Sequence, residues 1–206
     1  MSAQIINCEQ GSTEWFAARL GIPTASEFST VMAKGEGKTR KSYMLKLAGE
    51  VLTGEAMESY TNANMERGKV MEDEARDLYA FLKNCEPQRV GFIRNGNAGC
   101  SPDSLIGDKG GLEIKCALPH IQIDRLMKDE LPPEHKAQVQ GSIWIADREF
   151  WDFASYCSPK LPLFVKRVPR DNGYIANLKG EVDRFNDELQ AVVERIRKYG
   201  TEAVAA

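Results

Sequence analysis

The chain has 206 residues, of which 42% are apolar and 28% are charged, as in a globular protein with one domain and a substantial core. No apolar run approaches the ~18–20 residues that cross a bilayer, and the N-terminal segment lacks the pattern of a signal peptide, so we expect a cytoplasmic protein with no membrane partner. The net charge of −3 argues mildly against nucleic acid but does not exclude it, because basic residues can gather on one surface.

The cysteines and histidines are too scattered to suggest a disulfide framework or a zinc site. The five cysteines form no C-x-x-C pair, and the two histidines, His120 and His135, lie far apart in the sequence. Any metal site should therefore be built from oxygen ligands, which favours Mg²⁺, with Mn²⁺ as a substitute, over zinc.

Apolar periodicity predicts a single α/β domain over residues 1–206. Apolar residues at helical spacing predict helices, and alternating apolar and polar residues predict strands. Helices and strands mixed within one short chain are typical of a layer fold, here a central mixed β-sheet flanked by α-helices. In chain order we expect helices at 42–52 and 64–82, strands at 89–93, 99–101 and 112–116, a helix at 134–146, strands at 150–156 and 163–168, and a long amphipathic helix at 176–198.

Two segments are expected to lie outside these elements. Residues 34–42, KGEGKTRKS, are rich in glycine and basic side chains. Such a segment is either a solvated surface loop or a loop that contacts phosphates. Residues 200–206, at the C-terminus, are expected to form a flexible tail.

The strand predicted in GLEIKC, residues 111–116, carries an acid and a base on one face. Glu113 and Lys115 point to one side, and apolar residues point to the other. Asp103 lies ten positions before Glu113. Two carboxylates and a neighbouring backbone carbonyl could bind Mg²⁺, while Lys115 could hold or deprotonate an attacking water. The alternative is a surface strand with an ordinary Glu–Lys pair.

Two predicted helices each place a polar residue near their apolar face. Glu72 falls at the edge of a helical stripe that includes Met71, Ala75, Leu78, Tyr79 and Leu82. Gln138 is predicted to point inward with Gly141 and Ile145, whereas Gln140 is expected to point elsewhere. A buried carboxylate is costly unless it is paired or binds a metal, so both residues are either site residues or hydrogen-bonded core residues.

The N-terminal stretch QGSTEWFAARLGIPTAS suggests a phosphate site. A Gly-Ile-Pro turn separates Arg19 from the hydroxyl residues Thr24 and Ser26, either of which is placed to cap a following helix. A helix N-terminus beside a hydroxyl and a guanidinium can bind a phosphate. The alternative is a plain helix cap with a surface arginine.

Four blocks of the sequence together resemble one enzyme family. They are QGSTEWFAARLGIPTAS, ERGKVMEDEAR, CSPDSLIGDKGGLEIKC and AQVQGSIWIA. Their order and approximate spacing are similar to those of the phage lambda exonuclease family, the YqaJ-type viral recombinases, which are a branch of the PD-(D/E)XK nucleases. The resemblance covers residues 10–156 and implies a restriction-endonuclease-like core.

The resemblance implies a metal centre and assigns its residues. Asp103 and Glu113 match the two metal-ligating acids, the carbonyl of Ile114 matches a backbone ligand, and Glu72 matches the helical acid that completes the site. The family's Mg²⁺ sites imply two ions here. The remaining matches are Lys115, the catalytic lysine, and Gln138, the glutamine of the A-Q-V-Q helix.

The resemblance also implies how a DNA end is bound. Arg19 and Ser26 resemble the pair that receives the 5′-phosphate of the degraded strand. His135 stands where the lambda protein has a tyrosine, so it is a candidate DNA contact whose role stays open. Residues 117–130 align poorly, and no role is transferred to them.

The implied activity is a Mg²⁺-dependent exonuclease that degrades one strand of linear duplex DNA from its 5′ end to mononucleotides. It would leave a 3′ single strand for recombination with a single-strand annealing protein. Family members form homotrimer rings around DNA, so the resemblance implies such a ring here. It also implies a phage or prophage protein that works in the bacterial cytoplasm.

Two other functions remain open for this fold. The PD-(D/E)XK core also serves endonucleases, nickases and resolvases. A non-catalytic DNA-binding protein is the second alternative. Arg19 with Ser26 favours an exonuclease over an endonuclease, because only an enzyme that acts on DNA ends needs an anchor for a terminal phosphate. The non-catalytic alternative is disfavoured because every expected polar position of the site is occupied.

Overall fold

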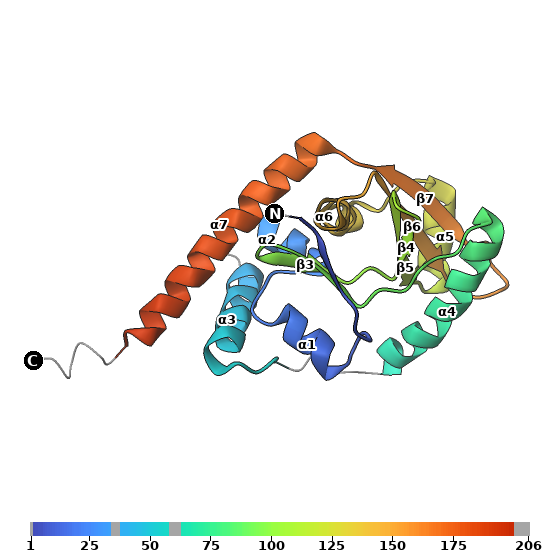
Figure 1. The fold of residues 1–206 in the computed structure, drawn as a ribbon. Coiled ribbons are helices and arrows are strands. Elements are labelled where there is room, and N and C mark those ends of the chain that lie inside the picture. The colour runs from blue at the N-terminus through green and yellow to red at the C-terminus, as the bar shows by residue number, and fades with distance from the viewer. Residues whose placement is uncertain (1, 34–37, 58–62, 200–206) are drawn as a thin grey trace, which may run out of the picture.

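The structure is a computed structural model that describes residues 2–33, 38–57 and 63–199. Helices lie on both sides of the strands (Figure 1). The elements are β1 Gln4–Ile6, α1 Thr13–Arg19, the short 3₁₀ helix η1 Ala25–Glu27, α2 Phe28–Met32, α3 Lys38–Thr53, α4 Ala63–Lys83, β2 Phe92–Asn95, β3 Ala98–Cys100, β4 Ser104–Ile106, β5 Gly110–Cys116, α5 Pro119–Lys128, the 3₁₀ helix η2 Pro133–His135, α6 Lys136–Ala146, β6 Phe150–Tyr156, β7 Phe164–Pro169 and α7 Asn172–Arg197.

The strands form a mixed sheet and a smaller antiparallel sheet. The mixed sheet has the order β4-β5-β6-β7, in which β5 and β6 are parallel and the two outer pairs are antiparallel. The smaller sheet has the order β1-β2-β3. A bridge between Gln88 and Leu105 joins the segment before β2 to β4. The predicted α/β class with a mixed sheet is confirmed, although the prediction did not include the division into two sheets.

The register of β5 and β6 sorts the two faces of the mixed sheet. Glu113 lies beside Phe153, and Lys115 lies beside Ser155. Because strand side chains alternate, these four residues share one face. The opposite face packs against α4 through a core that contains Ala75 and Tyr79. The acid and the lysine of β5 therefore point away from the face that α4 covers.

The larger core lies between the mixed sheet, the smaller sheet and four helices. It contains Phe28 of α2 and Phe153 of β6, and α7 closes it along one side (Figure 1). The buried stripe of α7 is Ile175, Leu178, Val182, Phe185, Leu189 and Val193. In the part of the chain that the structure describes, no helix is both long and apolar enough to cross a membrane.

Several predicted boundaries differ from the observed ones. Helix α3 begins at Lys38, so residues 38–42 of the predicted basic loop are helical, while residues 34–37 lie outside the described residues. The predicted tail, 200–206, also lies outside them. The apolar stripe of α4 ends early, because the Leu82 side chain is exposed. Elements β1, α1, β4 and α5 were not predicted. The first three are only three to seven residues long, whereas α5 is amphipathic and its pattern was overlooked.

Candidate active site

Two carboxylates meet where β4 and β5 begin to pair. Asp103 comes immediately before β4, and its Oδ2 accepts a hydrogen bond from the backbone N–H of Ile114 at 2.5 Å. Glu113, the residue before Ile114, is only 4% exposed. Burial, then repulsion by Glu113 and by Glu72, raises the pKa of Asp103 well above its usual range. The three acids thus form one electrostatically coupled group.

Lys115 and Gln138 both bind Glu113. The Lys115 Nζ lies 2.7 Å from Glu113 Oε1, and the Nε2 of Gln138 donates to the same oxygen at 2.6 Å. Burial works against the charged form of Lys115, but the hydrogen bond and charge of Glu113 and the charge of Asp103 together outweigh it and raise the pKa of the lysine. Lys115 is therefore an ammonium group at neutral pH, able to donate hydrogen bonds to an anion.

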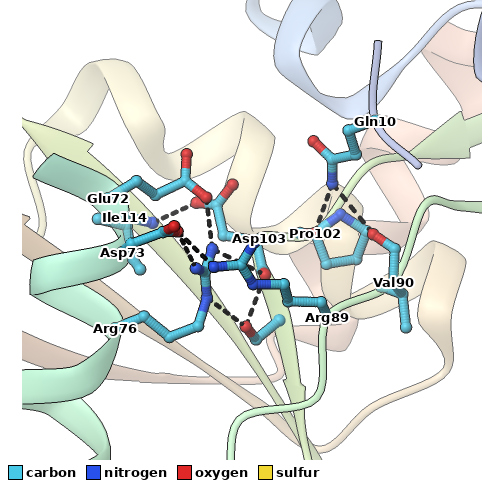
Figure 2. Close-up of polar contacts among 10 residues, drawn as sticks. Gln10, Glu72, Asp73, Arg76, Arg89, Val90, Pro102, Asp103 and Ile114 are labelled. Atoms are coloured by element: carbon cyan, nitrogen blue, oxygen red, sulfur yellow. Dashed lines mark hydrogen bonds and ion pairs between the residues drawn. The ribbon is translucent and has the colours of Figure 1, made fainter. Parts of the chain in front are cut away.

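Glu72 approaches the acids from α4, where Arg76 holds it (Figure 2). The Nη2 of Arg76 donates to Glu72 Oε1 at 2.5 Å, and its Nε donates to the Oγ of Ser104 at 3.0 Å. The same guanidinium reaches the backbone carbonyl of Asp103 at 3.4 Å and the carboxylate of Asp73 at 2.7 Å. Arg76, which the sequence reasoning missed, ties the helical acid to the segment that carries Asp103.

The oxygen donors of this site fit a divalent cation that prefers oxygen ligands, although Arg76 already binds one of the three acids. Among the described residues, no three Asp, Glu, His or Cys side chains are grouped as ligands of one ion. Asp103 and Glu113 repel each other in a poorly solvated place, and a divalent cation between them would relieve that repulsion. Glu72 would have to share its carboxylate with Arg76 or leave it. The carbonyl of Ile114 stays a predicted ligand.

Arg19 and Ser26 line a common cavity of about 250 Å³, together with Tyr43 and Lys46. Arg19 ends α1, and its guanidinium carbon lies 3.8 Å from the centre of the Trp15 ring. Arg19 forms no ion pair with any residue that the structure describes. The cavity therefore presents a guanidinium, an ammonium and three hydroxyls, the third from Thr24. Two carboxylates, Glu27 and Glu50, also line it.

The predicted helix cap beside this cavity is wrong. Thr24 precedes only the three-residue helix η1, and its side chain makes no capping bond. Its Oγ1 lies 3.2 Å from the Oγ of Ser26, and its backbone N–H donates to the hydroxyl of Tyr43 at 3.1 Å. Pro23 and the bridge between Thr24 and Gly99 keep this segment extended against β3. A phosphate here would meet these side chains beside the start of the short helix η1.

One of the acids that line the cavity, Glu50, already accepts hydrogen bonds from the backbone. Glu50 is 6% exposed and lines the cavity, where its charge would oppose that of a phosphate. However, its two oxygens accept backbone N–H groups, from Gly21 at 3.0 Å and from Met57 at 3.3 Å. These bonds stabilise the carboxylate and hold together the turn that follows Arg19.

His135 packs close to Lys115 but is not arranged as an acid or a base. Its ring stacks on Phe153, with 4.8 Å between the ring centres, and its Nε2 lies 3.1 Å from the Nη2 of Arg125. Burial, followed by the positive charges of Lys115 and Arg125, lowers the pKa of His135 to about 4. The imidazole is therefore neutral at physiological pH.

The two glutamines of α6 differ from the prediction in one respect. Gln138 does contact the site, through Glu113. Gln140 was predicted to point elsewhere, but it is buried, with 2% of its surface exposed. Its Nε2 donates to the carbonyl of Pro169 at 2.9 Å, and its Oε1 accepts the N–H of Asp171 at 3.0 Å. Helix α6 is buried on most sides, so its two glutamines serve different neighbours.

The comparisons with known proteins agree on one family. A family model described as a YqaJ-like viral recombinase domain matches residues 14–149. The alkaline exonuclease LHK-Exo from Laribacter hongkongensis is 35% identical over 93% of this chain and 100% of its own, with a TM-score of 0.85. Another structure of LHK-Exo, in complex with dAMP, has the same identity and coverage and a TM-score of 0.86.

A more distant structure shares the fold alone. The phage-related exonuclease of Haemophilus somnus is 14% identical, over 85% of this chain and 96% of its own, with a TM-score of 0.64. No curated protein matches the chain. The family match covers well over half of the sequence and includes every site residue that the sequence predicted. The chain belongs to the YqaJ-like viral recombinase family, and it is a nuclease by its kinship with these exonucleases.

Proposed function

We propose that the protein is a Mg²⁺-dependent exonuclease that degrades one strand of linear duplex DNA from the 5′ end. It releases mononucleotides and leaves a 3′ single strand. The observation that carries this proposal is the link between the Arg19 cavity and the acids. Trp15 lies under Arg19 and donates its indole N–H to Ser101, two residues before Asp103. A phosphate anchor joined to the acidic centre suits an enzyme that cuts beside a strand end.

In this mechanism each side chain has a distinct task. Asp103 and Glu113, with Glu72 and the carbonyl of Ile114, would hold two Mg²⁺ ions. The bound metal supplies Lewis acidity and lowers the pKa of a water. Lys115 would donate to an oxygen of the scissile phosphate, whose charge grows in the transition state. Gln138 fixes Glu113 through the 2.6 Å hydrogen bond.

The terminal phosphate would be bound in the cavity of Arg19 and Ser26. A guanidinium and a hydroxyl can bind phosphate oxygens through charge-assisted hydrogen bonds, without reading any base. This arrangement would select the strand end and present the next phosphodiester bond to the acids. The dAMP in one LHK-Exo structure is a nucleoside monophosphate, the class of product that we propose here.

The decisive experiment uses linear duplex DNA labelled separately at its 5′ and 3′ ends, with and without Mg²⁺. We expect early release of the 5′ label as a mononucleotide, late release of the 3′ label, and no release without the metal. A covalently closed plasmid serves as control and should survive while its linear form is degraded. Cleavage of the closed plasmid would instead support an endonuclease.

The wider biology is proposed from family membership. We infer that the protein assembles as a homotrimer ring around the DNA and delivers the 3′ strand to a single-strand annealing protein, in the cytoplasm of a bacterium that carries a phage or prophage. Sedimentation of the purified protein tests the assembly: a mass of one chain would contradict it.

A further inference from the structure

Arg125 of α5 is a buried cation without an acidic partner. It is 9% exposed and forms no ion pair with any described residue. The acids whose charges reach it, Glu134 and Asp124, do not bind it, and Asp124 instead pairs with Lys128 at 2.8 Å. An unpaired charge in such a place is costly, so it calls for a reason beyond the stability of the fold.

The guanidinium is held by neutral groups. Its Nη1 donates to the Oγ of Ser155 at 2.8 Å, and its Nη2 lies 3.1 Å from His135 Nε2. Ser155 in turn donates to the Oε1 of Gln122 at 2.6 Å, and the Nε2 of Gln122, a fully buried residue, donates to the carbonyls of Ser155 and Pro162. This network fixes the position of the charge but does not neutralise it.

Arg125 also lies beside the catalytic strand. Ser155 is the register partner of Lys115 in the parallel pair of β5 and β6. Arg125 therefore adjoins Lys115 from the β6 side. Its guanidinium carbon also lies 5.4 Å from the centre of the Phe153 ring, and Phe153 is the register partner of Glu113. Lys115 is compensated by Glu113, at 2.7 Å, whereas Arg125 is not compensated. The sheet face beside Lys115 thus carries a guanidinium that pairs with no carboxylate of the described residues.

We propose that Arg125, preorganised by Ser155 and His135, is a second phosphate subsite that binds a DNA backbone phosphate beyond the scissile one. The inference rests on the proposed function and extends it. With Arg19 at the terminal phosphate and Arg125 at a phosphate of the remaining strand, beside Lys115, the strand would be held on both sides of the reacting bond. Such two-point binding fixes the orientation of the scissile phosphate.

The test measures DNA binding without turnover, with Ca²⁺ in place of Mg²⁺. The dissociation constant for a 5′-phosphorylated duplex is measured over a salt series for the wild type, Arg125→Gln and Arg125→Lys. Loss of one phosphate contact should reduce the slope of log Kd against log salt concentration by about 0.9 in Arg125→Gln. Arg125→Lys keeps the charge and should keep the slope. The matched control is Arg184→Gln, because Arg184 is exposed and pairs with Glu181 within α7.

The outcomes separate a phosphate contact from a structural role. If Arg125 only supports the fold, Arg125→Gln would weaken binding or lower the melting temperature without changing the slope, which overturns the inference. If Arg125→Gln does not fold, wild-type binding to duplexes with single neutral methylphosphonates decides. Replacing one particular internal phosphate, beyond the scissile bond, by a neutral methylphosphonate should then lower both the affinity and the salt slope. Equal binding to every internally modified duplex would overturn the inference.

This test is independent of the proposed reaction. A protein that binds DNA with a slope dependent on Arg125 but degrades no end would contradict the proposed function alone. A protein that degrades 5′ ends but whose slope does not depend on Arg125 would contradict this inference alone.

Discussion

Trp15 donates its indole N–H to the Oγ of Ser101 at 3.0 Å. The same ring lies 3.8 Å below the guanidinium of Arg19, so one side chain touches both the phosphate cavity and the segment that leads to Asp103. Gln10 supports that segment from the other side, since its Nε2 donates to the carbonyls of Pro102 and Val90 (Figure 2). The spacing between anchor and acids is therefore set by side chains of the N-terminal segment.

Trp15→Phe should test this spacing. Phenylalanine keeps a ring under Arg19 but removes the hydrogen bond to Ser101. The free energy of unfolding should fall by about 1 kcal/mol, the usual net value of one hydrogen bond. The degradation rate should fall several-fold, while the preference for 5′-phosphorylated ends persists. A rate equal to that of the wild type would show that the bond does not set the spacing.

Arg19→Ala should weaken end selection more than catalysis. The variant loses the guanidinium that would bind the terminal phosphate, whereas the acids and Lys115 stay in place. We expect the ratio of rates on 5′-phosphorylated and 5′-hydroxyl duplexes to fall toward one. Lys109→Ala is the control, because Lys109 is exposed and pairs with Glu149 away from the cavity. An undiminished ratio would remove Arg19 from the anchor.

Asp103→Ala should abolish degradation while DNA binding persists, because the variant loses a carboxylate that we place on the metal. Degradation by this variant, in a preparation shown to be free of other nucleases, would end the assignment. A thermal melt gives a second measurement. Mg²⁺ should raise the melting temperature of the wild type, since a ligand of the folded state stabilises it, and should not raise that of the variant.

Asp103→Asn should stabilise the protein when no metal is present. The pKa of Asp103 is raised in the fold, so the folded state binds more protons than the unfolded one above the ordinary pKa of an aspartate. The ionised carboxylate therefore costs stability at neutral pH. In EDTA at pH 7 the amide should raise the melting temperature, and this gain should disappear at low pH, where the wild-type carboxyl is protonated. No gain at pH 7 would contradict the repulsion among the three acids.

Gln138→Leu and Gln140→Leu should separate the site from the scaffold. Gln138 orients Glu113, and groups that orient metal ligands are typically worth about 10–100-fold in metal affinity or activity. The first variant should therefore need more Mg²⁺ for half-maximal rate. The second breaks the buried bonds to Pro169 and Asp171, so its melting temperature should fall without a change in Mg²⁺ requirement. If Gln140→Leu raised the Mg²⁺ requirement and Gln138→Leu only lowered the melting temperature, the two assignments would be wrong.

The sequence predicted the long elements because their periodicity is local. The stripe of α7 and the alternation of β5 are each visible within one segment. Short elements such as β1 and β4 were missed, because their pairing with distant strands determines them and no local pattern does. The basic stretch at 38–42 was predicted as a loop on its charge, yet in α3 Arg40 pairs with Glu188 of α7 at 2.6 Å.

The candidate site was predictable where its residues follow a motif. Asp103 directly precedes β4, and Glu113 and Lys115 lie on its partner strand β5. The spacing suggested a shared site, and the family resemblance assigned the roles. Arg125 carried no such signal, because its partners, Ser155 and His135, come from two later elements. Arg76 carried a weak sequence signal, since it lies four residues after Glu72 on the same helix, a spacing at which an acid and a base can pair. Hydrogen-bond networks between residues distant in the sequence become visible only in the structure.

His135 should make the protein less stable in mild acid. Its pKa is lowered to about 4 in the fold, against about 6.5 for an unfolded histidine, so between these values the unfolded state binds more protons. Stability should therefore be complete above about pH 6.5 and should fall as the pH drops toward 4. His135→Gln removes this titration, and its free energy of unfolding should change less over the same range. His120→Gln is the control, because His120 is exposed at the start of α5. Equal slopes for wild type and His135→Gln, measured by urea denaturation at each pH, would show that the imidazole beside Arg125 and Lys115 is not held neutral.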